Sequence, residues 1–148
     1  MKKILFVLIL FSVSCNDQTA SKKKLSSKVE NPISNEIEIK LSSTDNMLFD
    51  KNIIYVNSRQ KVTLTLEHTG KMDKKIMGHN FVLLKKDVDV VSFATRAMVA
   101  RDSEYIPEGN ETIAYTKLIG GGESDTIVFE APEKGSYTYI CCLLYTSP

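Results

Sequence analysis

The chain has 148 residues, of which 43% are hydrophobic and 25% charged, and its formal net charge at pH 7 is +1. This composition is sufficient for one domain with a hydrophobic core. It excludes both an intrinsically disordered chain and a strongly basic nucleic-acid-binding protein. No glycine-rich phosphate loop, zinc-type cysteine pair or His-Glu-x-x-His pattern occurs in the sequence.

Residues 1–14 have the pattern of an export signal. A short basic head, Met1-Lys2-Lys3, precedes an apolar run that is too short to cross a bilayer comfortably. Small residues then lead to Cys15, and this segment resembles the lipobox of bacterial lipoproteins, although Ser12 stands where a leucine is usual. The resemblance implies that Cys15 becomes the lipidated first residue and anchors the protein to a membrane. An ordinary signal peptide cut elsewhere and an uncleaved anchor are the alternatives.

The sequence contains three cysteines, an odd number that cannot be fully paired within one exported molecule. If Cys15 carries a lipid, Cys141 and Cys142 are left over. Adjacent cysteines seldom bridge each other, because the geometry of such a bond is strained. At least one of these two residues therefore needs another explanation.

Beyond the signal, residues 15–35 are rich in Ser, Thr, Lys and Asn, which predicts a flexible, basic linker. From Glu36 onward the hydrophobic period is mostly two. Clear alternation or short apolar runs predict strands at residues 37–41, 53–56, 62–66, 81–84, 112–115, 126–129 and 137–141, with a short apolar return at 47–49. Short strands divided by turn residues predict an all-β sandwich or barrel.

Residues 88–105 depart from this period. The spacing of their apolar side chains predicts a short helix that serves as one crossover between the sheets, and Pro107 and Gly109 lie in the segment that ends it.

The segment Met77-Gly78-His79-Asn80 joins a polar loop to an apolar run and is the strongest candidate site. A histidine at such a junction is held by the strand and accessible from the loop, which suits a metal ligand. Gly78 allows the backbone to approach whatever His79 binds. A hydrogen-bonded histidine at a strand edge, with no ligand, is the alternative.

Three features together resemble azurin, a family of bacterial blue-copper proteins. They are Met77 to Leu83, then Thr116-Lys117-Leu118-Ile119-Gly120, and an aromatic-rich strand that ends in Cys141. The resemblance covers roughly Ile37 to Cys141. It implies a cupredoxin-like Greek-key β-sandwich with one short helical crossover that binds one type 1 copper ion.

By this resemblance, His79 is the first imidazole ligand, Cys141 the thiolate and Gly78 the axial carbonyl, a donor set that selects copper. Asn80 would hydrogen-bond around the thiolate and tie the two ligand loops together. His68 matches a histidine that is buried near the metal without binding it. Further side chains would line the apolar surroundings of the copper, namely Met47, Met77 and Phe81. Core packing alone also explains Cys141, the methionines and Phe81.

Two departures from the family matter. No cysteine lies near Ile37 or Gln60, so a disulfide of the family has no counterpart. After Cys141 the family continues with a Pro-Gly-His loop, a methionine ligand and a final strand. This chain instead continues with residues 142–148, Cys-Leu-Leu-Tyr-Thr-Ser-Pro. That tail resembles a translated sequencing adapter, so we expect a C-terminally truncated copy with a native domain at residues 36–141; a genuine short variant is the alternative. Copper on the chain as written would then be under-coordinated, and a strand edge would be unpaired.

The resemblance implies a carrier that shuttles single electrons between redox proteins, such as cytochromes or copper oxidases and reductases. We expect it in the bacterial cell envelope, facing the periplasm and anchored through Cys15, or alternatively soluble in the periplasm. A copper-delivery lipoprotein without a redox role and a metal-free structural lipoprotein are the competing hypotheses. We expect no enzyme, since no nucleophile–base or carboxylate pair is evident, and no nucleic-acid partner.

Overall fold

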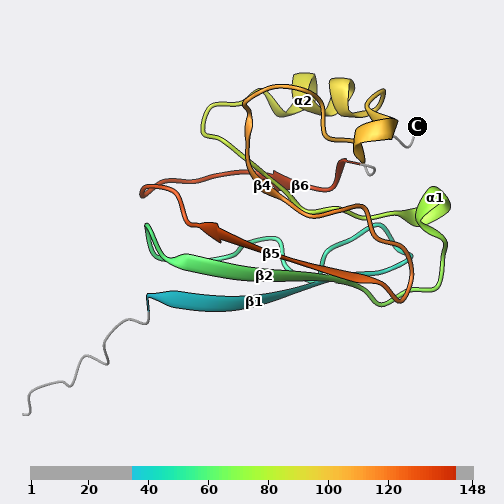
Figure 1. The fold of residues 1–148 in the computed structure, drawn as a ribbon, viewed down its shortest axis with the longest axis horizontal. Helices are drawn as coiled ribbons and strands as arrows, with labels where there is room; N and C mark the ends of the chain where they lie inside the picture. The colour runs from blue at the N-terminus through green and yellow to red at the C-terminus, as the bar shows by residue number, and fades with distance from the viewer. Residues whose placement is uncertain (1–34, 143–148) are drawn as a thin grey trace, which may run out of the picture. The chain divides into compact units, whose positions relative to one another are not determined.

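The computed structural model describes residues 35–142, which form two three-stranded β-sheets and short helices (Figure 1). The predicted signal peptide, Cys15, almost all of the predicted linker and residues 143–148 lie outside the described residues. Within the described part, no helix is long and apolar enough to cross a membrane.

The first sheet has the order β1-β2-β5, with β1 at Glu36–Ser43, β2 at Lys61–His68 and β5 at Ser124–Glu130. β2 pairs with β1 in parallel and with β5 antiparallel. The predicted alternation is confirmed, because charged and threonine side chains face outward while the aliphatic side chains enter the core. In β2 the buried positions are Val62, Leu64, Leu66 and His68, so the same period that fills the core also places His68 inside it.

The second sheet has the order β4-β3-β6, with β4 at Thr112–Tyr115, β3 at Val82–Leu84 and β6 at Tyr139–Ile140. All three residues of β3 are buried, because both faces of this central strand are covered. Phe81 and Leu83 join the core between the two sheets. Val82 and Leu84 join a second apolar cluster on the other face of the sheet, which α2 covers. This explains why the sequence is apolar without interruption here.

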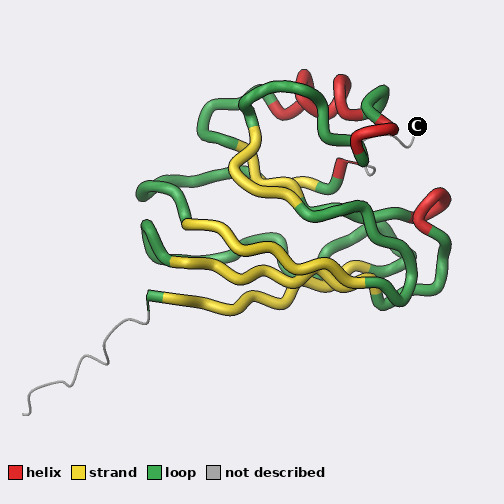
Figure 2. The backbone as a smooth tube through the Cα atoms, in the orientation of Figure 1, coloured by secondary structure: helices red, strands yellow, loops and turns green. Residues whose placement is uncertain are grey.

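The predicted helix is confirmed as α2 at Val90–Ala97, followed by a short 3-10 helix, η1, at Arg101–Ser103. The carboxylate of Asp89 caps α2 by accepting a hydrogen bond from the backbone N–H of Ser92 at 2.8 Å. α2 joins β3 to β4, which are neighbours in one sheet. The prediction that this helix crosses between the two sheets is therefore wrong. Figure 2 shows α2 between two loops, and the longer one follows α2 and leads through η1 to β4.

A second helix, α1 at Lys74–Met77, lies in the segment that the sequence suggested was only a polar loop. Asp73 provides its N-cap, since its carboxylate accepts from the backbone N–H of Lys75 at 2.8 Å. A single helical turn has too few residues to generate a hydrophobic period, which is why the pattern did not reveal it.

The predicted strand at residues 53–56 is wrong. Ile53 and Tyr55 are 59% and 84% exposed, and within residues 35–142 this segment pairs with no strand. Only Ile54 packs against the core. The apolar return at 47–49 is reduced to one bridge between Ser43 and Phe49. An apolar run forms a strand only where a neighbouring strand offers hydrogen bonds, and the described residues offer none to residues 53–56.

Candidate metal centre

His79 is fully buried and its orientation is fixed from two sides. Its backbone pairs with Ile119, with N–H to carbonyl distances of 2.9 Å in both directions. Its ring Nε2 donates to the carbonyl of Thr44 at 2.9 Å, which leaves the lone pair of Nδ1 available to a metal. Burial lowers the pKa of His79 below its ordinary value, although the hydrogen bond to Thr44 opposes the shift. The neutral form that a metal requires is therefore favoured.

Cys141 follows β6 and reaches the same point from the opposite direction. Its Sγ lies 3.6 Å from Nδ1 of His79 and 4.0 Å from the carbonyl oxygen of Gly78, and the residue is 2% exposed. Metal–sulfur and metal–nitrogen bonds are about 2.3 and 2.1 Å long, so one ion could contact both atoms. The structure therefore brings the thiol of Cys141, the imidazole of His79 and the carbonyl of Gly78 to one point.

Gly78 is required by packing rather than by backbone conformation, since its φ of −79° and ψ of 148° suit any residue. A Cβ at this position would lie 2.5 Å from the carbonyl oxygen of Lys74 and 3.0 Å from the Leu118 side chain. The missing side chain lets α1 and Leu118 close against the segment that carries His79. The Gly78 carbonyl is consequently held beside Cys141.

Asn80 links the segment that carries His79 to the backbone that follows Cys141. It is fully buried, and its side-chain oxygen accepts a hydrogen bond from the backbone N–H of Cys142 at 2.9 Å. Its amide nitrogen donates to the carbonyl of Glu104 at 3.0 Å. Every bond that this buried side chain makes therefore connects separate parts of the chain.

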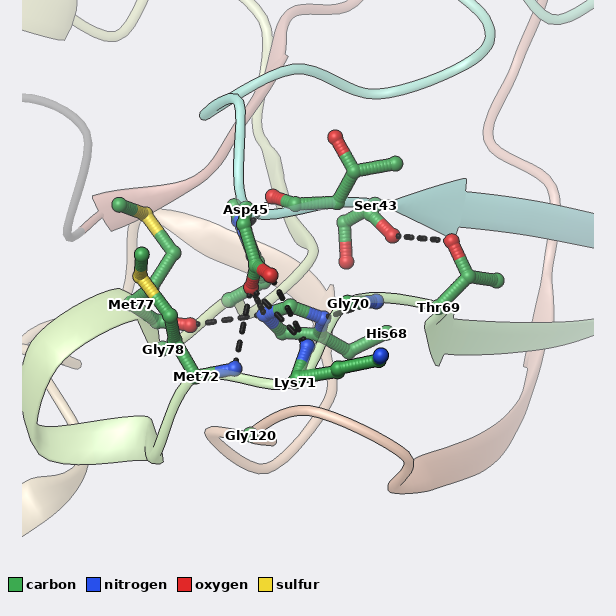
Figure 3. A network of polar contacts seen from close by, with 12 residues as sticks. Ser43, Asp45, His68, Thr69, Gly70, Lys71, Met72, Met77, Gly78 and Gly120 are labelled. Carbon is green, nitrogen blue, oxygen red and sulfur yellow. Dashed lines mark hydrogen bonds and ion pairs between the residues drawn. The ribbon is translucent and has the colours of Figure 1, made fainter.

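His68 lies beside the candidate centre with both ring nitrogens occupied (Figure 3). Its Nδ1 accepts from the backbone N–H of Gly70 at 3.0 Å, and its Nε2 donates to the carbonyl of Met77 at 2.9 Å. Its ring centroid is 4.8 Å from that of His79. With no free lone pair, His68 supports the centre and is not placed to bind a metal.

Asp45 was not predicted from the sequence as part of the site. Its carboxylate accepts hydrogen bonds from the backbone N–H groups of Lys71 and Met72 (Figure 3). These bonds lower the pKa of Asp45. Because Thr44 precedes Asp45, the same tie holds the carbonyl that orients His79.

Cys142 points away from Cys141. It belongs to the apolar cluster beneath α2, and burial raises its pKa to about 12. Alternation along an extended segment sends two adjacent side chains to opposite faces of the sheet, so only one of the two thiols reaches His79.

The apolar side chains observed around the candidate centre differ in part from those predicted. Phe81 is buried in the core and contacts Tyr139, with ring centroids 5.4 Å apart. Phe49, which the sequence did not single out, is the phenylalanine whose ring lies 6.3 Å from that of His79. Met47, in a loop, and Met77, the last residue of α1, are half-buried, and the carbonyl of Met77 accepts a hydrogen bond from His68.

Within residues 35–142, no group of three or more histidine, cysteine, aspartate or glutamate side chains is placed to hold a metal ion. The candidate centre in this range is therefore the pair His79 and Cys141, with the Gly78 carbonyl as a third donor.

The chain has extensive similarity to copper proteins. The family described as copper binding proteins, plastocyanin/azurin family, matches residues 35–142. Azurin of Bordetella pertussis is 37% identical over 112 residues, which cover 72% of this chain and 74% of that protein. Azurin of Pseudomonas fluorescens biotype C is 38% identical over 112 residues, with 72% and 87% covered.

Among solved structures, the reduced auracyanin of Roseiflexus castenholzii is 30% identical, with a TM-score of 0.59 and coverage of 71% of this chain and 83% of that one. This confirms the predicted cupredoxin-like Greek-key β-sandwich, and the family match confirms copper as the cofactor. The chain belongs to the plastocyanin/azurin family of copper-binding proteins.

Proposed function

We propose that this chain is a blue-copper electron carrier whose copper is held by Nδ1 of His79, Sγ of Cys141 and the carbonyl oxygen of Gly78. The observation that carries the proposal is the 3.6 Å separation of Sγ and Nδ1 at a buried point. A thiolate combined with imidazole is the donor set of electron-transfer copper sites. The likeness to azurins and to an auracyanin supports the same function.

Bound copper would supply one-electron redox chemistry, and the chain supplies a rigid, water-excluding frame. Thr44 and Ile119 hold His79 in one orientation. Asn80 holds the backbone next to Cys141. Because these supports are backbone and side-chain hydrogen bonds between loops of one sandwich, the donors have little freedom to move when the charge of the ion changes. Small movement is what rapid electron transfer requires.

The carrier would work in the bacterial cell envelope, facing the periplasm and exchanging electrons with cytochromes or with copper oxidases and reductases. The export-type pattern of residues 1–14 and the lipobox-like segment at Cys15 support this location and an anchor in the membrane. A soluble periplasmic protein is the alternative. Incorporation of labelled fatty acid, compared between the native chain and Cys15→Ala, separates the two.

Voltammetry of the copper-loaded protein tests the function. We expect a reversible one-electron wave that His79→Ala abolishes. His68→Gln should retain the wave, because His68 is assigned no donor role. A wave that survives His79→Ala, or a native protein with no reversible wave, contradicts the assignment.

A second candidate, copper delivery, is favoured by the small number of donors that residues 35–142 present. A delivery protein needs a site that releases its ion, whereas a carrier must retain it. Transfer of Cu(I) to a chromogenic chelator separates the two functions: rapid, complete transfer supports delivery, and retention over many redox cycles supports electron transfer.

A further inference from the structure

We propose that the left-handed turn at Glu104 and Tyr105 is a positioning device for the copper-binding segments. The main-chain carbonyl of Glu104 would fix the orientation of the Asn80 side chain and, through it, the position of Cys141 relative to His79. The inference rests on the proposed function and adds a positioning residue, Glu104, that touches no copper donor itself.

The turn has an unfavourable backbone conformation. Glu104 and Tyr105 have φ values of 56° and 64°, a region that side chains other than glycine seldom adopt. It is maintained by surrounding hydrogen bonds: the backbone N–H of Tyr105 donates to Ala100 at 2.8 Å, and that of Ile106 donates to Ser103 at 2.9 Å. A strained conformation that its surroundings enforce at two successive residues is typical of a functional constraint.

The strained turn aims the Glu104 carbonyl at a buried amide. Asn80 donates from its amide nitrogen to this carbonyl at 3.0 Å and accepts from the N–H of Cys142 at 2.9 Å. A carbonyl can only accept a hydrogen bond, so it determines which end of the Asn80 amide faces Cys142. If the amide turned over, its NH₂ group would face the N–H of Cys142, and two donors would meet in a buried site.

Glu104 also contacts the segment that supports His79 through the backbone of Ile119. Its carboxylate accepts from the backbone N–H of Leu118 at 3.3 Å. Leu118 packs against Gly78, and the next residue, Ile119, pairs with His79. One turn therefore contacts the supports of both the imidazole and the thiol.

Substitutions that change the preference for a left-handed backbone test the proposal. Asn tolerates this conformation and Val does not, so Glu104→Asn should keep the turn and Glu104→Val should displace it. Asp87→Val is the matched control, because exposed Asp87 also has a positive φ, 64°, but no contact with Asn80. Glu104→Ile, which is also β-branched, is a second variant that keeps the comparison usable if Glu104→Val does not fold.

The readouts are hydrogen exchange at the Cys142 amide and the NMR shifts of the Asn80 side-chain amide, both measured on the metal-free protein. We expect Glu104→Val or Glu104→Ile to speed exchange at Cys142 about tenfold relative to Asp87→Val, and to shift the Asn80 resonances. Glu104→Asn should match the native protein. Equal exchange in the Glu104 and Asp87 variants, or unchanged Asn80 resonances, would overturn the proposal.

Copper binding then provides an independent readout. Adding Cu(II) to the Glu104→Val protein should shift the visible band of the native site, whereas Asp87→Val should leave that band in place. If the native protein gives no such band, the proposed function fails, while the exchange results still decide whether the turn positions Cys142.

Discussion

Sγ of Cys141 lies 3.6 Å from Nδ1 of His79, although 62 residues separate them in sequence. The antiparallel pairing of Val82 with Ile140 explains this proximity. Extended by one residue, the register sets Cys141 opposite Phe81, and His79 lies two residues before Phe81 on the same face. Diagonal neighbours of this kind are within side-chain reach.

Gly78→Ala should destabilise the protein and weaken copper binding. The added Cβ would meet the Lys74 carbonyl oxygen at 2.5 Å, and a backbone atom cannot move aside as a flexible side chain can. We expect a loss of about 1–3 kcal/mol in the free energy of unfolding, measured by urea denaturation of the metal-free protein.

Gly135→Ala is the control for this substitution. There the new Cβ would meet only the ring of Tyr137, at 3.2 Å, and that side chain can shift. A loss below about 1 kcal/mol is expected. If both variants lose the same stability, close packing around Gly78 is not what requires glycine.

His79 should make the metal-free protein sensitive to mild acid. Burial lowers its pKa in the folded state, so below the ordinary histidine pKa of about 6.5 the unfolded chain binds a proton that the folded chain excludes. Stability should therefore fall as the pH drops from about 6.5, with a slope of at most about 1.4 kcal/mol per pH unit.

Replacing His79 by Gln should flatten this dependence between about pH 7 and 5. Unfolding curves of the two proteins at matched pH values provide the comparison. An unchanged slope would show that His79 is not buried in its neutral form.

Asp45 should contribute stability that depends on its charge. The N–H groups of Lys71 and Met72 lower its pKa, so its contribution is present above the ordinary carboxyl pKa and disappears as the pH falls through the lowered value. Asp45→Asn should reduce stability at neutral pH and weaken the acid dependence below about pH 4. Asp102→Asn, in exposed η1, is the control; a loss equal to that of Asp45→Asn would contradict the assigned role.

Which side chains of the site share one face of the extended backbone was predictable from sequence. His79 and Phe81 are two residues apart in the segment that leads into β3, and Tyr139 and Cys141 are two residues apart at β6, so each pair faces one side of its segment. Their meeting point was not predictable from period alone, because a register depends on which strands pair. The resemblance to azurin supplied that information.

The supports of the site were harder to predict because they act largely through main-chain atoms. The carbonyls of Thr44, Met77 and Glu104 hold His79, His68 and Asn80. Every residue has a main-chain carbonyl, so the residue type does not mark these positions in the sequence. Residues 53–56 show the opposite failure: a sequence suited to a strand has no partner among the described residues.

The visible absorption spectrum of the protein after addition of Cu(II) tests the central claim most directly. The comparison is between Cys141→Ala and Cys142→Ala, because the two thiols are adjacent and only that of Cys141 faces His79. We predict an intense charge-transfer band from the thiolate in the native protein and in Cys142→Ala, and its complete loss in Cys141→Ala. A band that survives Cys141→Ala, or that disappears in Cys142→Ala, would contradict the assignment of Cys141 as the copper thiolate.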